Sequence, residues 1–147
     1  MKLKPSEHSL QVAVLAYLTF CAAKDINVIA IPNAARRSLR LGARMKAEGL
    51  QSGVADLCIM LPGGKVAWLE LKTDKGRQSI AQKGFEAKCK RLDHPYALAR
   101  TLDEAIAAVN QNNDLGEDSL TAAIDHDIAA EDIADIARAA LAPEQDK

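Results

Sequence analysis

Two apolar runs separated by a Pro-Gly-Gly turn constrain the fold of this 147-residue chain more than any other feature. Residues 54–61 read VADLCIML, and residues 65–73 read KVAWLELKT. Both runs have the composition of β-strands, and Pro62-Gly63-Gly64 between them is a strong turn signal. The sequence therefore predicts a β-hairpin in which the second strand returns antiparallel alongside the first.

Helix and strand patterns alternate on both sides of this hairpin. Strands are expected at 27–31 and 96–100, and a basic loop with room for a short helix is expected over 34–52, ending at Gly49 or Gly53. This order predicts an α/β fold in which a mixed sheet carries helices on its faces.

Three helices complete this order. The first, over 7–24, has Ser6 as a suitable N-cap and an apolar stripe of Leu10, Val14, Tyr17, Leu18 and Cys21. The second, over 78–92, presents Ala81, Gln82, Phe85, Cys89 and Leu92 along one face. The third follows a capping box, in which Thr101 and Glu104 exchange hydrogen bonds, and continues to about Val109.

Charge is distributed unevenly along the chain, although the net charge is only −1. Residues 1–111 hold 17 Lys or Arg and 10 Asp or Glu, a net of +7, whereas residues 112–147 hold 2 and 10, a net of −8. This predicts one domain over 1–111, followed by an acidic linker and an Ala-rich helical tail over 112–147. A basic domain favours a polyanionic partner, but a merely soluble basic domain explains these charges equally well.

The cysteines and the most apolar segment both indicate an intracellular protein. Cys21, Cys58 and Cys89 are odd in number and form no C-x-x-C, so we expect reduced, buried thiols rather than disulfides or metal ligands. The apolar run at 12–23 is shorter than the roughly 20 residues that span a bilayer. It also lacks the cleavage site of a signal peptide. We therefore expect a cytoplasmic protein that does not bind membranes.

Residues with catalytic potential lie on the hairpin. Glu70 and Lys72 are two residues apart on one strand and so share a face, and the hairpin brings Asp56 roughly level with Glu70. Such a group suits phosphodiester hydrolysis, because carboxylates bind Mg²⁺, the metal acidifies a bound water, and an ammonium stabilises the transition state. Taken alone, the E-x-K triplet is more simply an exposed strand face with an ion pair.

Cations concentrate before and after the hairpin. Five occur within eleven residues of the expected basic loop, and two follow the second strand. A solvated loop explains them without any ligand, but on a basic domain they favour contact with phosphates. The predicted DNA-binding residues are Arg36, Arg37, Arg40, Arg44, Lys46, Lys75 and Arg77.

Five motifs occur in order between Glu7 and Val109: Glu7 with Gln11; Ile31-Pro32-Asn33 with Arg36 and Arg37; KAEGLQSGVADL at 46–57; Leu69-Glu70-Leu71-Lys72; and Gly76-Arg77-Gln78-Ser79 through Gln82. Together they resemble a VRR-NUC domain, a branch of the PD-(D/E)XK nuclease superfamily. Two positions depart from the family's pattern. Ala34 follows Asn33 where a glycine is common, and Ala55 replaces a proline often found before the aspartate.

The resemblance implies a restriction-endonuclease-like fold and a metal-dependent DNA endonuclease. It implies that the metal is Mg²⁺, which Mn²⁺ can replace, and that its ligands are Asp56, Glu70, the Leu71 carbonyl and Glu7. It also implies that Lys72 positions the attacking water and that Gln82 contacts the site from its helix. Without the resemblance, Glu7 is explained by favourable charge at a helix N-terminus, and Gln82 by half-burial.

Small stand-alone members of this family resemble junction resolvases, so the resemblance implies a homodimer that cuts branched DNA in a bacterial or phage-infected cell. One alternative is a nicking or flap nuclease acting with a replication or repair partner. Another is a catalytically idle DNA-binding module. The acidic tail would compete with DNA for the basic face, assist dimerisation through its apolar side, or only add solubility.

Overall fold

The structure, a computed structural model, describes residues 6–21, 26–32 and 38–112. The predicted tail therefore lies outside the described residues, as do Arg36 and Arg37. Among the described helices, none has both the length and the apolar character needed to cross a membrane. The elements are α1 (Glu7–Cys21), β1 (Asn27–Ala30), α2 (Leu39–Ala47), β2 (Leu57–Leu61), the 3-10 turn η1 (Pro62–Gly64), β3 (Lys65–Leu71), α3 (Ile80–Arg91), β4 (Tyr96–Ala99) and α4 (Leu102–Asn112).

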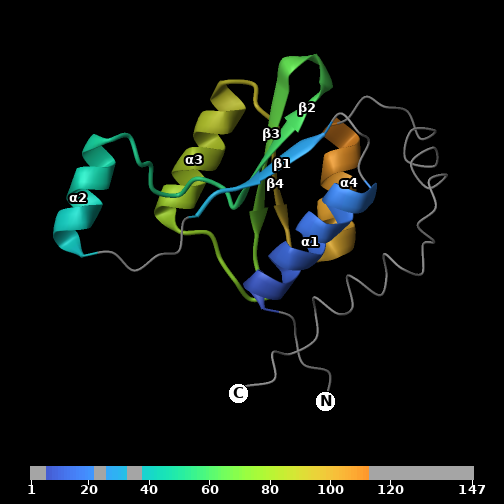
Figure 1. Ribbon diagram of the computed structural model, residues 1–147, viewed down its shortest axis with the longest axis horizontal. Coiled ribbons are helices and arrows are strands. Elements are labelled where there is room, and N and C mark those ends of the chain that lie inside the picture. Colours follow the sequence, from blue (N-terminus) through green and yellow to red (C-terminus); the bar gives the residue numbers. More distant parts are fainter. Residues whose placement is uncertain (1–5, 22–25, 33–37, 113–147) are drawn as a thin grey trace.

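The strands form one mixed sheet in the order β1-β2-β3-β4. β2 is antiparallel to β1 and to β3, whereas β4 runs parallel to β3. The predicted hairpin is confirmed, since Leu57 pairs with Leu69 and Leu61 with Lys65. Gly63 at φ 74° and Gly64 at φ 75° close it in the left-handed region that favours glycine. Figure 1 shows α1 and α4 on one face of this sheet, α3 on the other, and α2 standing beyond α3.

The apolar core lies on the face covered by α1 and α4. Every second residue of β2 and β3 points into it, because strand side chains alternate between faces. The buried strand residues are Leu57, Ile59, Leu61, Ala67, Leu69 and Leu71, and the helices add Leu10, Val14, Leu18, Ala105 and Val109. Burying each Leu or Ile contributes about 2 kcal/mol. The alternate residues lie on the opposite face, where Trp68 and Glu70 contact α3.

Two elements differ from the predictions in extent. β2 begins at Leu57 rather than at residue 54, because the pairing with β1 and β3 begins only there. The basic segment contains a nine-residue helix, α2, whose N-cap Ser38 accepts a hydrogen bond from the Leu41 N–H at 3.3 Å. α2 buries none of its residues, so its polar and apolar sides are both exposed to solvent.

Two predicted details of the later helices are wrong. Ala81 and Leu92 are exposed, Leu92 because it is the C-cap that follows the last turn of α3. Before α4, Thr101 Oγ1 accepts from the Glu104 N–H as predicted, but the Glu104 carboxylate accepts from the Arg100 N–H instead of that of Thr101. Cys89 is buried as predicted and Cys58 is half-buried; both are free thiols.

Candidate active site

Asp56 is held in place by both neighbouring strands. Its backbone carbonyl accepts from the Ile31 N–H at 2.8 Å, and its Oδ2 accepts from the Leu71 N–H at 2.8 Å. The pairing of Leu57 with Leu69 places Asp56, one residue earlier, level with Glu70, as the sequence predicts. The Leu71 carbonyl leaves the strand on the same side as its N–H and so points toward Asp56.

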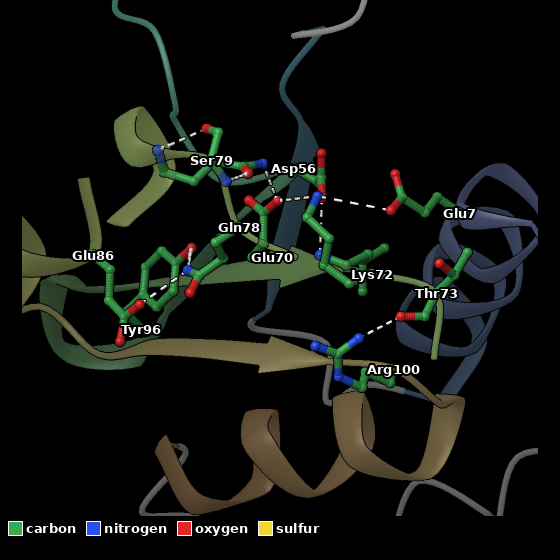
Figure 2. A network of polar contacts seen from close by, with 12 residues as sticks. Glu7, Asp56, Glu70, Lys72, Thr73, Gln78, Ser79, Glu86, Tyr96 and Arg100 are labelled. Carbon is green, nitrogen blue, oxygen red and sulfur yellow. Dashed lines mark hydrogen bonds and ion pairs between the residues drawn. The ribbon is translucent and has the colours of Figure 1, made fainter. Parts of the chain in front are cut away.

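Glu70 and Lys72 share the face opposite the core. The side chain of Glu70 is completely buried and that of Lys72 is 10% exposed, and Lys72 Nζ lies 2.7 Å from Glu70 Oε1. Glu7, at the first turn of α1, places Oε1 at 3.8 Å from the same Nζ, and its side chain is half exposed. Figure 2 shows the ammonium of Lys72 between the Glu70 and Glu7 carboxylates, with Asp56 beside it. The face therefore carries a charged cluster, not an isolated ion pair.

Gln82 joins this cluster from α3. The Gln82 side-chain Oε1 accepts from the Ser79 N–H at 2.8 Å, and the Gln82 backbone N–H donates to Ser79 Oγ at 3.2 Å. These two hydrogen bonds form a capping box. The Gln82 amide Nε2 then donates to Glu70 Oε1 in a short hydrogen bond. The same side chain therefore starts the helix and orients the carboxylate, so the predicted contact of Gln82 with the site is present.

Two glycines shape this site, and the sequence analysis gave neither a role of its own. A Cβ on Gly53, three residues before Asp56, would lie 2.2 Å from the Ala81 carbonyl carbon and 2.6 Å from the Gln82 nitrogen. Gly53 thus seats the first turn of α3 against the chain that leads to Asp56. The sequence marks Gly53 only as an end of the basic loop, and the tertiary contact gives it this further role.

Gly76 is the second of these glycines. A Cβ there would lie 3.1 Å from Thr73 Oγ1, 3.2 Å from Lys72 Cδ and 3.3 Å from Glu7 Oε1. Its N–H donates to the Thr73 carbonyl at 3.0 Å, which closes a turn directly after β3. The Arg100 guanidinium donates to the same carbonyl (Figure 2). The turn therefore packs against both partners of the Lys72–Glu7 pair.

Burial dominates the electrostatics of the three central groups. Desolvation raises the pKa of Asp56 despite its hydrogen bond from Leu71, and it raises the pKa of Glu70 despite the neighbouring Lys72 ammonium. The carboxylates of Asp56 and Glu7 raise the pKa of Glu70 further. Burial alone would lower the pKa of Lys72, but its hydrogen bond with Glu70 and the charges of the three carboxylates raise it above the ordinary value. The cluster therefore holds more negative charge than one ammonium compensates.

Glu70 supplies the test of whether a metal fits. Its Oε2 is buried and finds no hydrogen-bond partner in the described parts of the chain. A buried carboxylate oxygen without a partner is costly, and an ion is one explanation for it. Mg²⁺ is bound by one or two carboxylates and keeps several waters, so Asp56 and Glu70 fit it as donors.

The Glu7 carboxylate lies against Lys72 at the edge of the cluster. Within the described ranges, no group of three or more His, Cys, Asp or Glu side chains is arranged to hold a metal ion. The roles of Glu7 and of the Leu71 carbonyl as metal ligands therefore stay predictions.

The five predicted DNA-binding residues that the structure describes make none of the contacts within this cluster. Arg40, Arg44 and Lys46 are exposed on α2, where Arg44 Nε pairs with Glu48 Oε1 at 2.8 Å. Lys75 and Arg77 are exposed in the segment that connects β3 to α3. In Figure 1, α2 stands on the far side of α3 from α1, whose first turn carries Glu7. Any role of these cations is therefore in binding and not in chemistry.

An aromatic cluster fixes α3 on the sheet. The Phe85 ring meets Trp68 edge-on with centroids 5.0 Å apart and meets Tyr96 at 6.3 Å. Gln78 Nε2 donates to Glu86 Oε2 at 2.9 Å and to Tyr96 Oη at 3.2 Å. Because Trp68 lies on the same face of β3 as Glu70, these contacts set the height of α3, and hence of Gln82, above the carboxylate.

Two solved structures superpose on this chain over most of its length. One, described as a VRR_NUC domain protein, superposes with a TM-score of 0.59 at 18% identity, over 74% of this chain and 88% of its own length. The chain has a VRR_NUC-type fold. The other, described as a VRR_NUC domain, gives a TM-score of 0.49 at 16% identity over 71% of this chain and 96% of its own.

No protein-family model matches the sequence, and neither does any curated protein. The predicted α/β class and the mixed sheet flanked by helices are confirmed by the VRR_NUC-type fold. Since fold alone does not determine activity, the function of this VRR_NUC-type chain has to be argued from its side chains.

Proposed function

We propose that the protein is a metal-dependent DNA endonuclease that hydrolyses phosphodiester bonds at the Asp56–Glu70–Lys72 cluster. The observation that carries this proposal is the buried Oε2 of Glu70, which has no hydrogen-bond partner among the described residues and lies next to a second carboxylate with a raised pKa. Two desolvated carboxylates beside one ammonium favour a hard divalent cation, for which Mg²⁺ is the natural choice and Mn²⁺ a substitute. The VRR_NUC-type fold supports the same activity.

Each residue of the cluster has a distinct task in this proposal. When bound by Asp56 and Glu70, the metal would supply a Lewis acid and lower the pKa of a water. Lys72, held at 2.7 Å from Glu70 and 3.8 Å from Glu7, keeps its ammonium charged and aimed at one position, where it orients the attacking water and offsets charge on the phosphate. The Leu71 N–H fixes the Asp56 carboxylate, and the Gln82 amide fixes that of Glu70.

The proposed substrate is branched DNA, cut by a homodimer because two strands must be broken. This part rests on the resemblance of the motifs to stand-alone VRR-NUC domains. A nuclease that nicks DNA or cuts flaps with a replication or repair partner would use the same cluster. A catalytically idle DNA-binding module is less well supported, since an idle site has no need to bury Glu70 and Lys72 together.

The test is cleavage of a labelled four-way junction, a flap, a plain duplex and a single strand, each with Mg²⁺, with Mn²⁺ and with EDTA. The wild type is compared with Lys72→Ala and with Lys65→Ala, which removes the exposed cation at the opposite end of β3. We expect metal-dependent cutting that Lys72→Ala reduces by at least about a hundredfold and Lys65→Ala leaves intact, with circular dichroism showing that both variants fold. Tight binding without cutting under either metal would favour the idle module.

A further inference from the structure

Lysine and arginine are segregated among the helices of this protein. α1 and α4, which cover the core face, contain none, and their charged residues are Glu7, Asp103 and Glu104. α2 and α3 contain seven, against the single acid Glu86. Three of the seven belong to α2 and were assigned to DNA from the sequence. The other four, here called the α3 cations, have no role in the site: Lys83, Lys88, Lys90 and Arg91.

The α3 cations occupy the solvent side of their helix. Gln82, Phe85 and Cys89 mark the side that faces the sheet, and all four cations are exposed. Lys83 directly follows Gln82, which contacts Glu70, so the α3 cations begin next to the active site. Lys90 lies seven residues later on the same line of the helix, about 10 Å further from the site. That length is roughly three nucleotide steps along one strand of DNA.

The existing contacts of these side chains are weak. Lys90 Nζ pairs with Glu86 Oε1 at 2.6 Å within its own helix, with 67% of the Lys90 side chain exposed. Lys88 Nζ donates to Gln51 Oε1 at 3.3 Å. Lys83 and Arg91 form no ion pair with another residue of the described ranges. Since exposed pairs contribute less than about 1 kcal/mol, a phosphate can replace them.

We infer that the α3 cations form a phosphate-contacting surface along which one strand of the DNA runs away from the active site. This inference rests on the proposed function for the identity of the partner. The contact with Gln51 places Lys88 beside the chain that follows α2. Figure 1 shows α2 and α3 on the same side of the sheet. Contacts of this kind position DNA without reading its sequence.

The test is the salt dependence of DNA binding in EDTA, which prevents cleavage, measured by anisotropy with a short fluorescent duplex and the full-length chain. Each lost phosphate contact lowers the slope of log K against log salt by about 0.9. We expect Lys83→Ala to lower the slope by about 1 and the Lys83→Ala/Arg91→Ala double variant by about 2. Lys65→Ala is the matched control, and its slope should equal that of the wild type.

Cleavage kinetics separate this inference from the proposed function. Because the surface binds substrate and transition state equally, the double variant should raise KM and keep kcat. A wild-type slope in the double variant would overturn the α3 surface even if the protein cuts DNA. A lowered slope in a protein that cuts no DNA would overturn the proposed function alone. No binding of the duplex by the wild type would overturn the α3 surface, and the cleavage test on branched DNA would then decide the proposed function alone.

Discussion

At the end of β3, both faces of the sheet are buried, but they are chemically opposite. On the core face, Leu69 and Leu71 are each 1% exposed and pack against α1 and α4. On the site face, Glu70 is 0% exposed and Lys72 is 8% exposed. Burial of the leucines stabilises the fold directly, whereas burial of the Glu70 carboxylate costs free energy that its partners only partly return. Alternate residues along this stretch of chain therefore have different roles: Leu69 and Leu71 stabilise the fold, whereas Glu70 and Lys72 form the site.

The covering helices repeat this division. α1 and α4 meet the sheet through apolar side chains and carry no cations. α3 meets the sheet through one aromatic cluster and one amide, and its exposed side is cationic. Because the core is complete on one side, the other side tolerates an uncompensated carboxylate beside the site. We therefore expect substitutions on the two faces to separate stability from activity.

The largest effect on stability is expected for Leu69→Ala. This change removes a fully buried side chain from the core face, which costs about 3 kcal/mol of unfolding free energy from lost burial and the cavity left behind. Denaturant unfolding in EDTA measures this loss. Cleavage per folded molecule should stay near the wild-type value, and a site-specific loss of kcat in the folded fraction would mean that the two faces are not independent.

Glu70→Gln, in contrast to Leu69→Ala, should abolish cleavage without a loss of unfolding free energy at neutral pH. Its effect on the unfolding free energy should depend on pH. Burial raises the pKa of Glu70 above its ordinary 4.5, so the native state holds the proton more tightly than the unfolded state. In metal-free protein, this contribution is fully present below pH 4.5 and is lost as the pH rises through the folded pKa. Glutamine cannot ionise, so the variant lacks that loss.

Unfolding of both proteins in EDTA between pH 4 and 8 provides the measurement. The free energy of unfolding of Glu70→Gln, relative to the wild type, should increase with pH, while cleavage is abolished. Asp103→Asn, which removes a carboxylate exposed on α4, is the control for a general effect of charge. A difference that decreases with pH would show that Lys72 stabilises the Glu70 carboxylate by more than burial costs it.

The centre of the site could be predicted from the sequence because its geometry is local. A two-residue period places Glu70 and Lys72 on one face, and the short Pro-Gly-Gly turn fixes the register that brings Asp56 to Glu70. The mixed sheet followed from the order of the elements. Glu7 was expected in the cluster only from the resemblance, and its carboxylate lies 3.8 Å from Lys72 Nζ.

The rest depends on contacts between segments distant in sequence, which no local pattern encodes. α2 buries none of its residues, so no core contact marks its position, and Ala81, which was predicted on one face with Phe85 and Cys89, is exposed. Gly53 looks like a turn residue, but its role comes from an approach of 2.2 Å between its missing Cβ and the backbone of Ala81. The metal set and the DNA-binding residues stay predictions.

The smallest effect on stability, and the sharpest test of the division, is expected for Gly76→Ala. The new methyl would meet Lys72 Cδ at 3.2 Å and Glu7 Oε1 at 3.3 Å, and both neighbours can move by a few tenths of an ångström. The unfolding free energy should change by less than about 1 kcal/mol, since Gly→Ala also reduces the entropy of the unfolded chain. kcat should fall about tenfold, because small displacements of an aligned ammonium are costly.

Gly84→Ala is the matched control for Gly76→Ala, since a Cβ on Gly84 of α3 meets nothing within 4 Å. If the methyl acts by displacing Glu7 from Lys72, the effect of Gly76→Ala on kcat should shrink in a Glu7→Ala background, where the carboxylate is absent. Equal effects in both backgrounds would instead mean that the methyl acts by distorting the turn that Gly76 forms with Thr73. The site face would then depend on its backbone turn more than on the position of the Lys72–Glu7 pair.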